Sequence, residues 1–327
     1  MNNLLDDNHA AQEWANYAIL RNSNDNFGKL VPVIIWTDAK DKNGDILVPQ
    51  DPLALASDIN SNPYILLHNH DPGRPKGQVL ESAVFETKEG NKFVVGIVGF
   101  YAGGDVKNFQ EVGLDVNAKA ISPARLPKLP DHVWIEVAVD PREVEETWLD
   151  LVTGDAPLRI KRTVLSHNAE DSAQELIRIG LTYLAIVWNP FTTAIASEAG
   201  KSTYAAVHVW IRKLLNRLTE RCDPILDIHT HQDGCQVSFI FRGKDVRQHY
   251  VAHDGLAKAA AQAASLVANL KAQEMAGRQL IYEFDKDALI WFPSYAVLND
   301  GRIITNNAAL IAIERLPEEL SLGIRLE

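Results

Sequence analysis

Two histidines, His68 and His70, stand where a short apolar segment passes into a loop rich in proline and glycine. Residues 64–67 are apolar and few enough for a buried strand, and residues 72–77 indicate a constrained loop. Catalytic groups often lie at such a junction, because the strand fixes their position and the loop leaves access. A neutral imidazole can act as a general base, although a single histidine at a strand end is more often structural.

Ser122 is the candidate nucleophile that His70 could activate. A serine hydroxyl attacks a carbonyl poorly until a base takes its proton, and a third group should orient the imidazole. The candidates for this third group are Asp71, His132, Glu136 and Asp140. Sequence spacing leaves open which of them meet in space, so the residues alone do not select this pair over others.

A second pattern, Asp227-x-His229-x-His231, is similar to the D-x-H-x-H motif of metal-dependent hydrolases. On a strand these three side chains share one face, and carboxylate and imidazole groups are suitable metal ligands. In barrel hydrolases the motif begins the first strand, whereas here it lies late in the chain. The alternative is the exposed face of a hairpin strand that ends at an Asp233-Gly234 turn.

Composition places the chain among globular proteins and argues against several partners. The 327 residues are 46% hydrophobic and 23% charged, and the net charge of -11 makes duplex nucleic acid an unexpected partner. The two cysteines form no metal or disulfide pattern, and the acidic N-terminal segment does not resemble a signal peptide. We therefore expect a cytoplasmic protein, and the polar residues and Asn189-Pro190 within the uncharged run 179–197 argue against a membrane-spanning helix.

Short β-branched and apolar segments dominate the first half of the chain. They predict strands at residues 30–37, 79–87, 92–100, 117–121 and 133–139. Because few helices are expected among them, the first 150 residues or so should form a mostly-β sheet or barrel.

The second half has a different pattern, with helices expected at residues 166–197, 201–221 and 257–272. Strands are expected between and after them, at 225–228, 236–242, 280–284 and 289–292. The chain is therefore predicted to be α+β, with a mostly-β domain at 1–152 and an α+β domain at 153–327. The second domain could serve regulation, substrate recognition or assembly.

Four segments of the first domain resemble the phage prohead (capsid maturation) serine proteases, relatives in fold of the herpesvirus assemblin proteases. They are residues 41–49 (DKNGDILVP), 69–79 (NHDPGRPKGQV), 118–122 (AKAIS) and 135–141 (IEVAVDP). Their order and spacing agree with that family across roughly residues 30–145, and the histidine segment is the most specific. The resemblance implies a barrel-like domain in which His70 is the catalytic histidine and Ser122 the nucleophile. It leaves the third member open, with Glu136 as the first choice.

The resemblance implies a serine endopeptidase of phage or prophage origin that acts in capsid maturation. Its partner would be a protein or peptide substrate, such as a capsid or scaffold protein, and a homo-oligomer is compatible with this role. One alternative is a catalytically inactive protease-like scaffold that binds or assembles proteins, because Pro123 lacks the N–H that an oxyanion hole could use. The other alternative is the metal-dependent hydrolase built on Asp227, His229 and His231.

Overall fold

The computed structural model describes residues 4–40, 44, 46, 48, 50–68, 71–116, 133–165, 175–181 and 198–306, with the side chains of 198–201 excepted. The chain divides into two compact units. The first contains Met1–His68, Arg74–Val106 and Ala308–Glu327, and the second contains Asn69–Gly73 and Lys107–Asn307. These bounds differ from the expected domains at 1–152 and 153–327, because the segment after Val106 belongs to the second unit.

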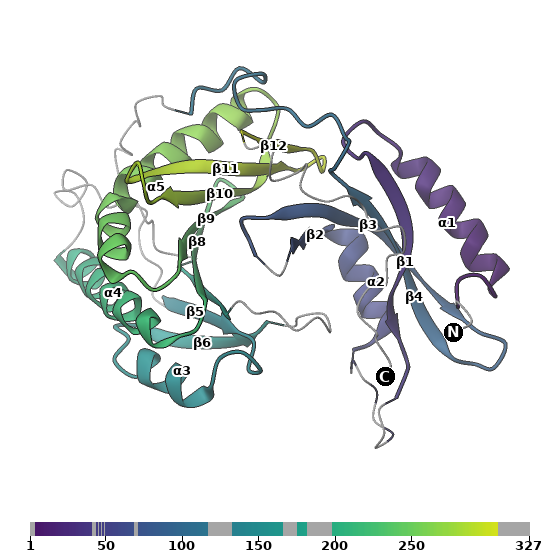
Figure 1. Ribbon diagram of the computed structural model, residues 1–327, viewed down its shortest axis with the longest axis horizontal. Helices are drawn as coiled ribbons and strands as arrows, with labels where there is room; N and C mark the ends of the chain where they lie inside the picture. The colour runs from purple at the N-terminus through teal and green to yellow at the C-terminus, as the bar shows by residue number, and fades with distance from the viewer. Residues whose placement is uncertain are drawn as a thin grey trace. The chain divides into compact units, whose positions relative to one another are not determined.

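The first unit is built on a four-stranded antiparallel sheet in the order β1-β4-β3-β2. Its strands are β1 (Lys29–Thr37), β2 (Tyr64–Leu67), β3 (Pro75–Glu86) and β4 (Lys92–Phe100). Helices α1 (His9–Asn22) and α2 (Pro52–Ser61) cover opposite faces of this sheet (Figure 1). The expected hairpin around residues 88–91 is confirmed as the β3–β4 connection, in which Gly90 adopts φ +86°.

The alternation of side chains along β4 explains the two layers of packing in this unit. Phe93, Val95 and Ile97 pack against the alanine stripe of α1, whereas Val94 and Val98 pack with residues of α2. The stripe consists of alanines at 11, 15 and 18, which share one helical face and let the helix approach the sheet closely. The central strand is thus buried on both faces.

The second unit is built on an eight-stranded mixed sheet in the order β12-β11-β10-β9-β8-β7-β5-β6. Its strands are β5 (Trp134–Val139), β6 (Arg159–Val164), β7 (Glu175–Gly180), β8 (Pro224–Gln232), β9 (Cys235–Arg242), β10 (Gly277–Asp285), β11 (Ile290–Leu298) and β12 (Ile303–Thr305). Its helices are α3 (Glu146–Thr153), α4 (Glu198–Arg217) and α5 (Val246–Ala272). A 3-10 turn at Leu218–Glu220 directly follows α4. Among the described helices, none is both long and apolar enough to cross a membrane.

Three helix crossovers determine which strands of this sheet are parallel. Strands β5 and β6, β7 and β8, and β9 and β10 pair in parallel, and the connections within these pairs contain α3, α4 and α5 respectively. The remaining described pairs are antiparallel. Figure 1 shows α3, α4 and α5 along one face of the sheet, where they bury a single apolar core.

The structure confirms an α+β fold with two sheets and, among the described residues, five α-helices. The expected barrel-like form is not confirmed, because both sheets are open in the described part of the chain. Strand β5, expected in the first domain, pairs with β6 and β7 in the eight-stranded sheet. The helix prediction for 166–197 is wrong at residues 175–180, which form β7 between β5 and β8 in the sheet. The strand predicted at 117–121 falls outside the described residues.

Helices α4 and α5 meet at a pair of histidines. His208 Nδ1 lies 3.1 Å from His253 Nε2, and the side chain of His253 is only 5% exposed. Burial lowers the pKa of both imidazoles to about 4, helped at His208 by the charge of His253 and at His253 by the charge of Arg212. Both rings are therefore neutral in the folded protein near pH 7.

This pair predicts a loss of stability on mild acidification. The unfolded chain binds protons on these histidines below its ordinary pKa of about 6.5, whereas the folded protein resists protonation until about pH 4. The stability that the neutral pair provides is therefore complete above about pH 6.5 and declines as the pH falls toward 4. Between pH 7 and pH 5 we expect the free energy of unfolding to fall by about 4 kcal/mol, roughly half of it from each histidine.

Urea denaturation at the two pH values measures this loss. The double substitution H208Q/H253Q should flatten the pH dependence, whereas His9→Gln, whose side chain is 84% exposed, should leave it unchanged. An equal pH dependence in the double variant and the wild type would contradict the assignment.

Candidate functional site

The face of the eight-stranded sheet opposite the helices carries most of the candidate chemistry. Along β8, Leu226 and Ile228 face the apolar core, while Asp227, His229 and His231 alternate onto the other face. The register places Asp227 opposite Arg178 of β7, and Glu136 of β5 opposite Gly180. Farther along the sheet, Arg242 of β9 and Glu283 of β10 lie on this same face. We call it the polar face, although apolar residues are interspersed on it.

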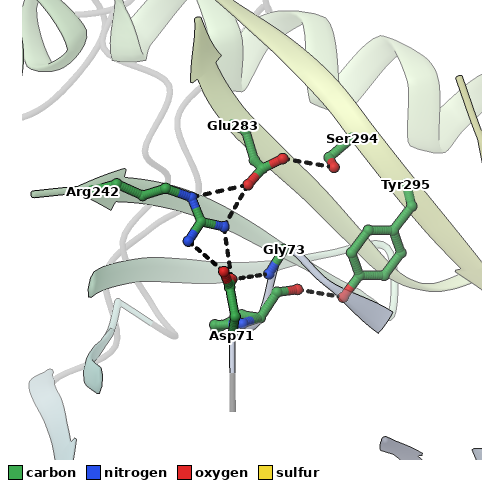
Figure 2. Close-up of polar contacts among 7 residues, drawn as sticks. Asp71, Gly73, Arg242, Glu283, Ser294 and Tyr295 are labelled. Carbon is green, nitrogen blue, oxygen red and sulfur yellow. Dashed lines mark hydrogen bonds and ion pairs between the residues drawn. The ribbon is translucent and has the colours of Figure 1, made fainter. Parts of the chain in front are cut away.

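One arginine organises the part of the polar face that receives residues 71–73. The Arg242 guanidinium donates to both oxygens of Asp71, with Nη1–Oδ2 and Nη2–Oδ1 distances of 2.7 Å each (Figure 2). The same guanidinium reaches Glu283 Oε1 from Nε at 3.1 Å and from Nη2 at 2.5 Å. We call this arrangement of Arg242, Asp71 and Glu283 the arginine clamp.

The clamp holds a tight turn whose backbone is also bonded. Asp71 Oδ1 accepts from the Gly73 N–H at 2.8 Å, and the Tyr295 hydroxyl donates to the Pro72 carbonyl at 2.6 Å (Figure 2). Asp71 and Tyr295 are fully buried. A Cβ at Gly73 would lie 2.3 Å from both Arg242 Nη2 and Glu283 Oε1, so only glycine lets the turn approach the clamp this closely.

The charges of the clamp compensate its burial. Burial alone would lower the pKa of Arg242, but the hydrogen bonds and charges of Asp71 and Glu283 outweigh it and raise the pKa. The second carboxylate oxygen of Glu283 accepts from the Ser294 hydroxyl at 2.9 Å. A carboxylate as deeply buried as Asp71 requires such a partner, because an unpaired buried charge is strongly destabilising.

The structure accounts for two of the four candidate third groups. The carboxylate of Asp71 is bound by Arg242. Asp140 is 2% exposed and binds the backbone N–H and the guanidinium of Arg142, so it shapes the turn after β5. The expected catalytic residues His70 and Ser122, and the candidate His132, lie outside the described residues.

Glu136, the first choice for the third group, lies half-buried on β5 and on the polar face. Its Oε1 accepts from the Thr163 hydroxyl of β6 at 3.1 Å. The neighbouring strand presents Gly180 at this point, and a Cβ there would lie 3.0 Å from His229 Nε2 and 3.1 Å from the Glu136 Cβ. The missing side chain therefore leaves space in which the His229 ring approaches Glu136.

Asp227 lies beside this histidine and is fully buried. Its Oδ2 pairs with Arg178 Nε at 2.9 Å, whereas its Oδ1 has no hydrogen-bond partner in the described part of the chain. Burial lowers the pKa of His229, although the carboxylates of Asp227 and Glu136 act to raise it. The buried His229 Nδ1 likewise lacks a partner among the described residues.

The metal interpretation of Asp227, His229 and His231 gains no support from the geometry. The described residues contain no group of three or more His, Cys, Asp or Glu side chains placed to hold a metal ion. The rings of His229 and His231 are 6.4 Å apart between centroids, and His231 is exposed. The expected hairpin is confirmed, with β8 turning at Asp233-Gly234 into β9.

Sequence reasoning missed the clamp because its members are far apart in the chain. Asp71 and Arg242 are 171 residues apart, and Arg242 ends an apolar strand without any local motif. The only sequence signal is the conjunction of an aspartate, a proline and a glycine at 71–73, which indicates a turn but not its partner.

Removal of the clamp arginine should destabilise the second unit. Arg242→Met leaves Asp71 buried without its cation, so we expect the free energy of unfolding to fall by about 3 kcal/mol. Arg242→Lys should lose less, because lysine keeps the charge but cannot bridge two carboxylates with a planar fork. Urea denaturation of the three proteins measures both effects.

The matched control is Arg302→Met, which removes an ion pair to Asp300 whose side chains are about half exposed. Loss of this exposed pair should change stability by less than about 1 kcal/mol. An equal loss of unfolding free energy in Arg242→Met and Arg302→Met would contradict the claim that burial of Asp71 makes the clamp more stabilising than an exposed ion pair.

Comparison with known proteins assigns no family to this geometry. No protein-family model, no curated protein and no solved structure matches the chain. The resemblance of residues 41–141 to prohead proteases therefore stays a prediction from sequence motifs, and the catalytic roles of His70, Ser122 and Glu136 are proposals.

Proposed function

We propose that the chain is a serine endopeptidase in which Ser122 is the nucleophile, His70 the general base and Glu136 the orienting carboxylate. The observation that supports it most is the arginine clamp. The clamp fixes Asp71, the residue next to His70 in the chain, on the sheet that also carries Glu136. Catalysis by a serine requires the histidine to be held in a fixed place, and a buried bidentate ion pair provides such an anchor.

Chain connectivity adds a second argument. Ser122 lies between Val116 and Val133, and both of these valines pack against the apolar core of the second unit. The segment that carries the nucleophile therefore begins and ends in the same unit as the clamped turn. Glu136 follows Val133 by only three positions in the chain.

In the proposed reaction, the Ser122 hydroxyl attacks a peptide carbonyl while His70 takes its proton. The tetrahedral intermediate collapses, His70 gives that proton to the leaving amine, and the acyl group stays on the serine. Water then attacks the ester, again with His70 accepting and returning a proton, and the free acid leaves. Glu136 would hold the imidazole in the required tautomer and would stabilise its protonated form.

The chemistry proposed here needs no cofactor, and its partner is a protein or peptide. Within this proposal the motif resemblance favours a capsid or scaffold protein as substrate, a cytoplasmic setting in a phage-infected or prophage-bearing cell, and an oligomer of identical chains. A catalytically inactive scaffold remains the second candidate, because Pro123 directly follows the proposed nucleophile and has no N–H to donate to an oxyanion.

A fluorophosphonate probe tests the proposal, because it reacts with an activated serine whatever the substrate. Intact-mass analysis should show one adduct on the wild-type protein, and Ser122→Ala and His70→Ala should abolish it. Glu136→Gln should slow labelling by at least about tenfold, because it removes the charge that stabilises the imidazolium.

Two control variants separate a specific loss from a general one. Ser202→Ala removes an exposed serine of α4, and His9→Ala removes an exposed histidine, so both should label like the wild type. Absence of labelling in the folded wild type, or persistence in Ser122→Ala, would exclude the proposed nucleophile and leave the scaffold candidate.

A further inference from the structure

Two buried polar atoms on the polar face lack partners, and neither the arginine clamp nor the proposed catalytic residues explain them. They are Asp227 Oδ1 and His229 Nδ1, which belong to side chains two positions apart on the same face of β8. Buried polar groups in folded proteins nearly always have hydrogen-bond partners. Among the described residues other such atoms occur in the helices, for example His249 Nδ1, but these two lie on one strand of the polar face and point to a group that binds there from outside.

The surroundings of His229 indicate whether Asp227 Oδ1 and His229 Nδ1 require a hydrogen-bond donor or an acceptor. Its Nε2 and the Glu136 Cβ lie close to the same point above Gly180, so the Nε2 edge of the ring is directed toward the Glu136 side. A nearby carboxylate favours the tautomer with its proton on Nε2, which leaves Nδ1 as an acceptor. Asp227 Oδ1 is an acceptor in any case, so the missing group must donate at least two hydrogen bonds.

The charge balance favours a cation. Asp227 and Glu136 carry two negative charges, and Arg178, 28% exposed, pairs with only one oxygen of Asp227. A buried carboxylate oxygen without a partner is strongly destabilised, and a cationic donor relieves this more than a neutral one. The cations that donate two or more N–H groups are guanidinium and alkylammonium.

The burial gradient along β8 favours a long side chain. Asp227 is fully buried, His229 is half-buried and His231 is exposed. A ligand that reaches Asp227 must enter from the exposed end of β8 at His231 and extend along the strand. Its charge must therefore lie at the end of a long, narrow chain. Arginine and lysine have this shape, with an apolar stem and a terminal donor.

We propose that Asp227, His229 and Glu136 form a binding site for the cationic side chain of an arginine or lysine residue in a peptide. Its Nη or Nζ hydrogens donate to Asp227 Oδ1 and His229 Nδ1, and Glu136 supplies the second negative charge. Only the identification of this peptide as a substrate rests on the proposed peptidase function; binding itself does not.

Calorimetric titration of the full chain with two matched ligands tests the proposal without turnover. N-acetyl-arginine amide carries a guanidinium, and N-acetyl-citrulline amide replaces it with a neutral urea of the same length. We expect the arginine compound to bind at least about tenfold more tightly, as a charge-assisted hydrogen bond to a buried carboxylate implies. Equal affinities, or no binding by either, would overturn the proposal on the wild-type protein alone.

Variants then locate the site. Asp227→Asn and Glu136→Gln should each remove most of the arginine preference, whereas His231→Gln at the exposed end of the same strand should keep it. Because Asp227 also pairs with half-buried Arg178, circular dichroism must first show that Asp227→Asn folds; Glu136→Gln tests the site if it does not. An unchanged preference in folded variants would place the binding elsewhere and contradict the proposal.

Three further outcomes distinguish the arginine site from the peptidase and from a polyamine site. Arginine binding in a protein that does not react with the fluorophosphonate probe would retain the site and reject the peptidase. Labelling without any preference for arginine would reject the site and retain the peptidase. Spermidine that binds as tightly as the arginine compound, with the same dependence on Asp227, would contradict a peptide ligand and assign the site to free polyamines.

Discussion

The buried ion pair between Asp71 and Arg242 is the constraint on which the arrangement of the polar face and of the turn at residues 71–73 depends. A carboxylate with no exposure to water is stable only if its negative charge is matched, and here both of its oxygens meet one guanidinium. Glycine at position 73 and the Tyr295 hydroxyl complete the arrangement, so the path of the turn has little freedom.

The eight-stranded sheet provides this constraint through its asymmetry. Three β-α-β crossovers place the helices and the apolar core on one face, which leaves the other face for charged side chains. Charged side chains on that face pair between neighbouring strands, as Arg178 of β7 does with Asp227 of β8 and Arg242 of β9 with Glu283 of β10. Asp227 Oδ1 and His229 Nδ1 are buried atoms of this face to which the described residues provide no hydrogen-bond partner.

Individual strands, hairpins and helices could be predicted from the sequence more successfully than the contacts between them. The β3–β4 hairpin, the β8–β9 hairpin and the part of helix α5 at 257–272 follow from alternation, turn residues and alanine-rich periodicity, which are local properties, whereas the first part of α5, from Val246, was not predicted. Strand β7 was mistaken for helix, because its short sequence ELIRIG is β-branched only in part and its strand form depends on β5 and β8 on either side. The assignment of β5 to the second sheet, and the pairing of Asp71 with Arg242, depend on contacts distant in sequence that no local pattern encodes.

Hydrogen–deuterium exchange of the peptide that spans residues 71–74 tests the central claim most directly. The Gly73 N–H donates to the buried Asp71 carboxylate, so the account predicts slow exchange in the wild type and exchange at least about tenfold faster in Arg242→Met, with the β3–β4 hairpin unchanged as the internal reference. Exchange in the wild type as fast as at the exposed Gly44 turn, or equal rates in the two proteins, would contradict the claim that the clamp fixes this turn.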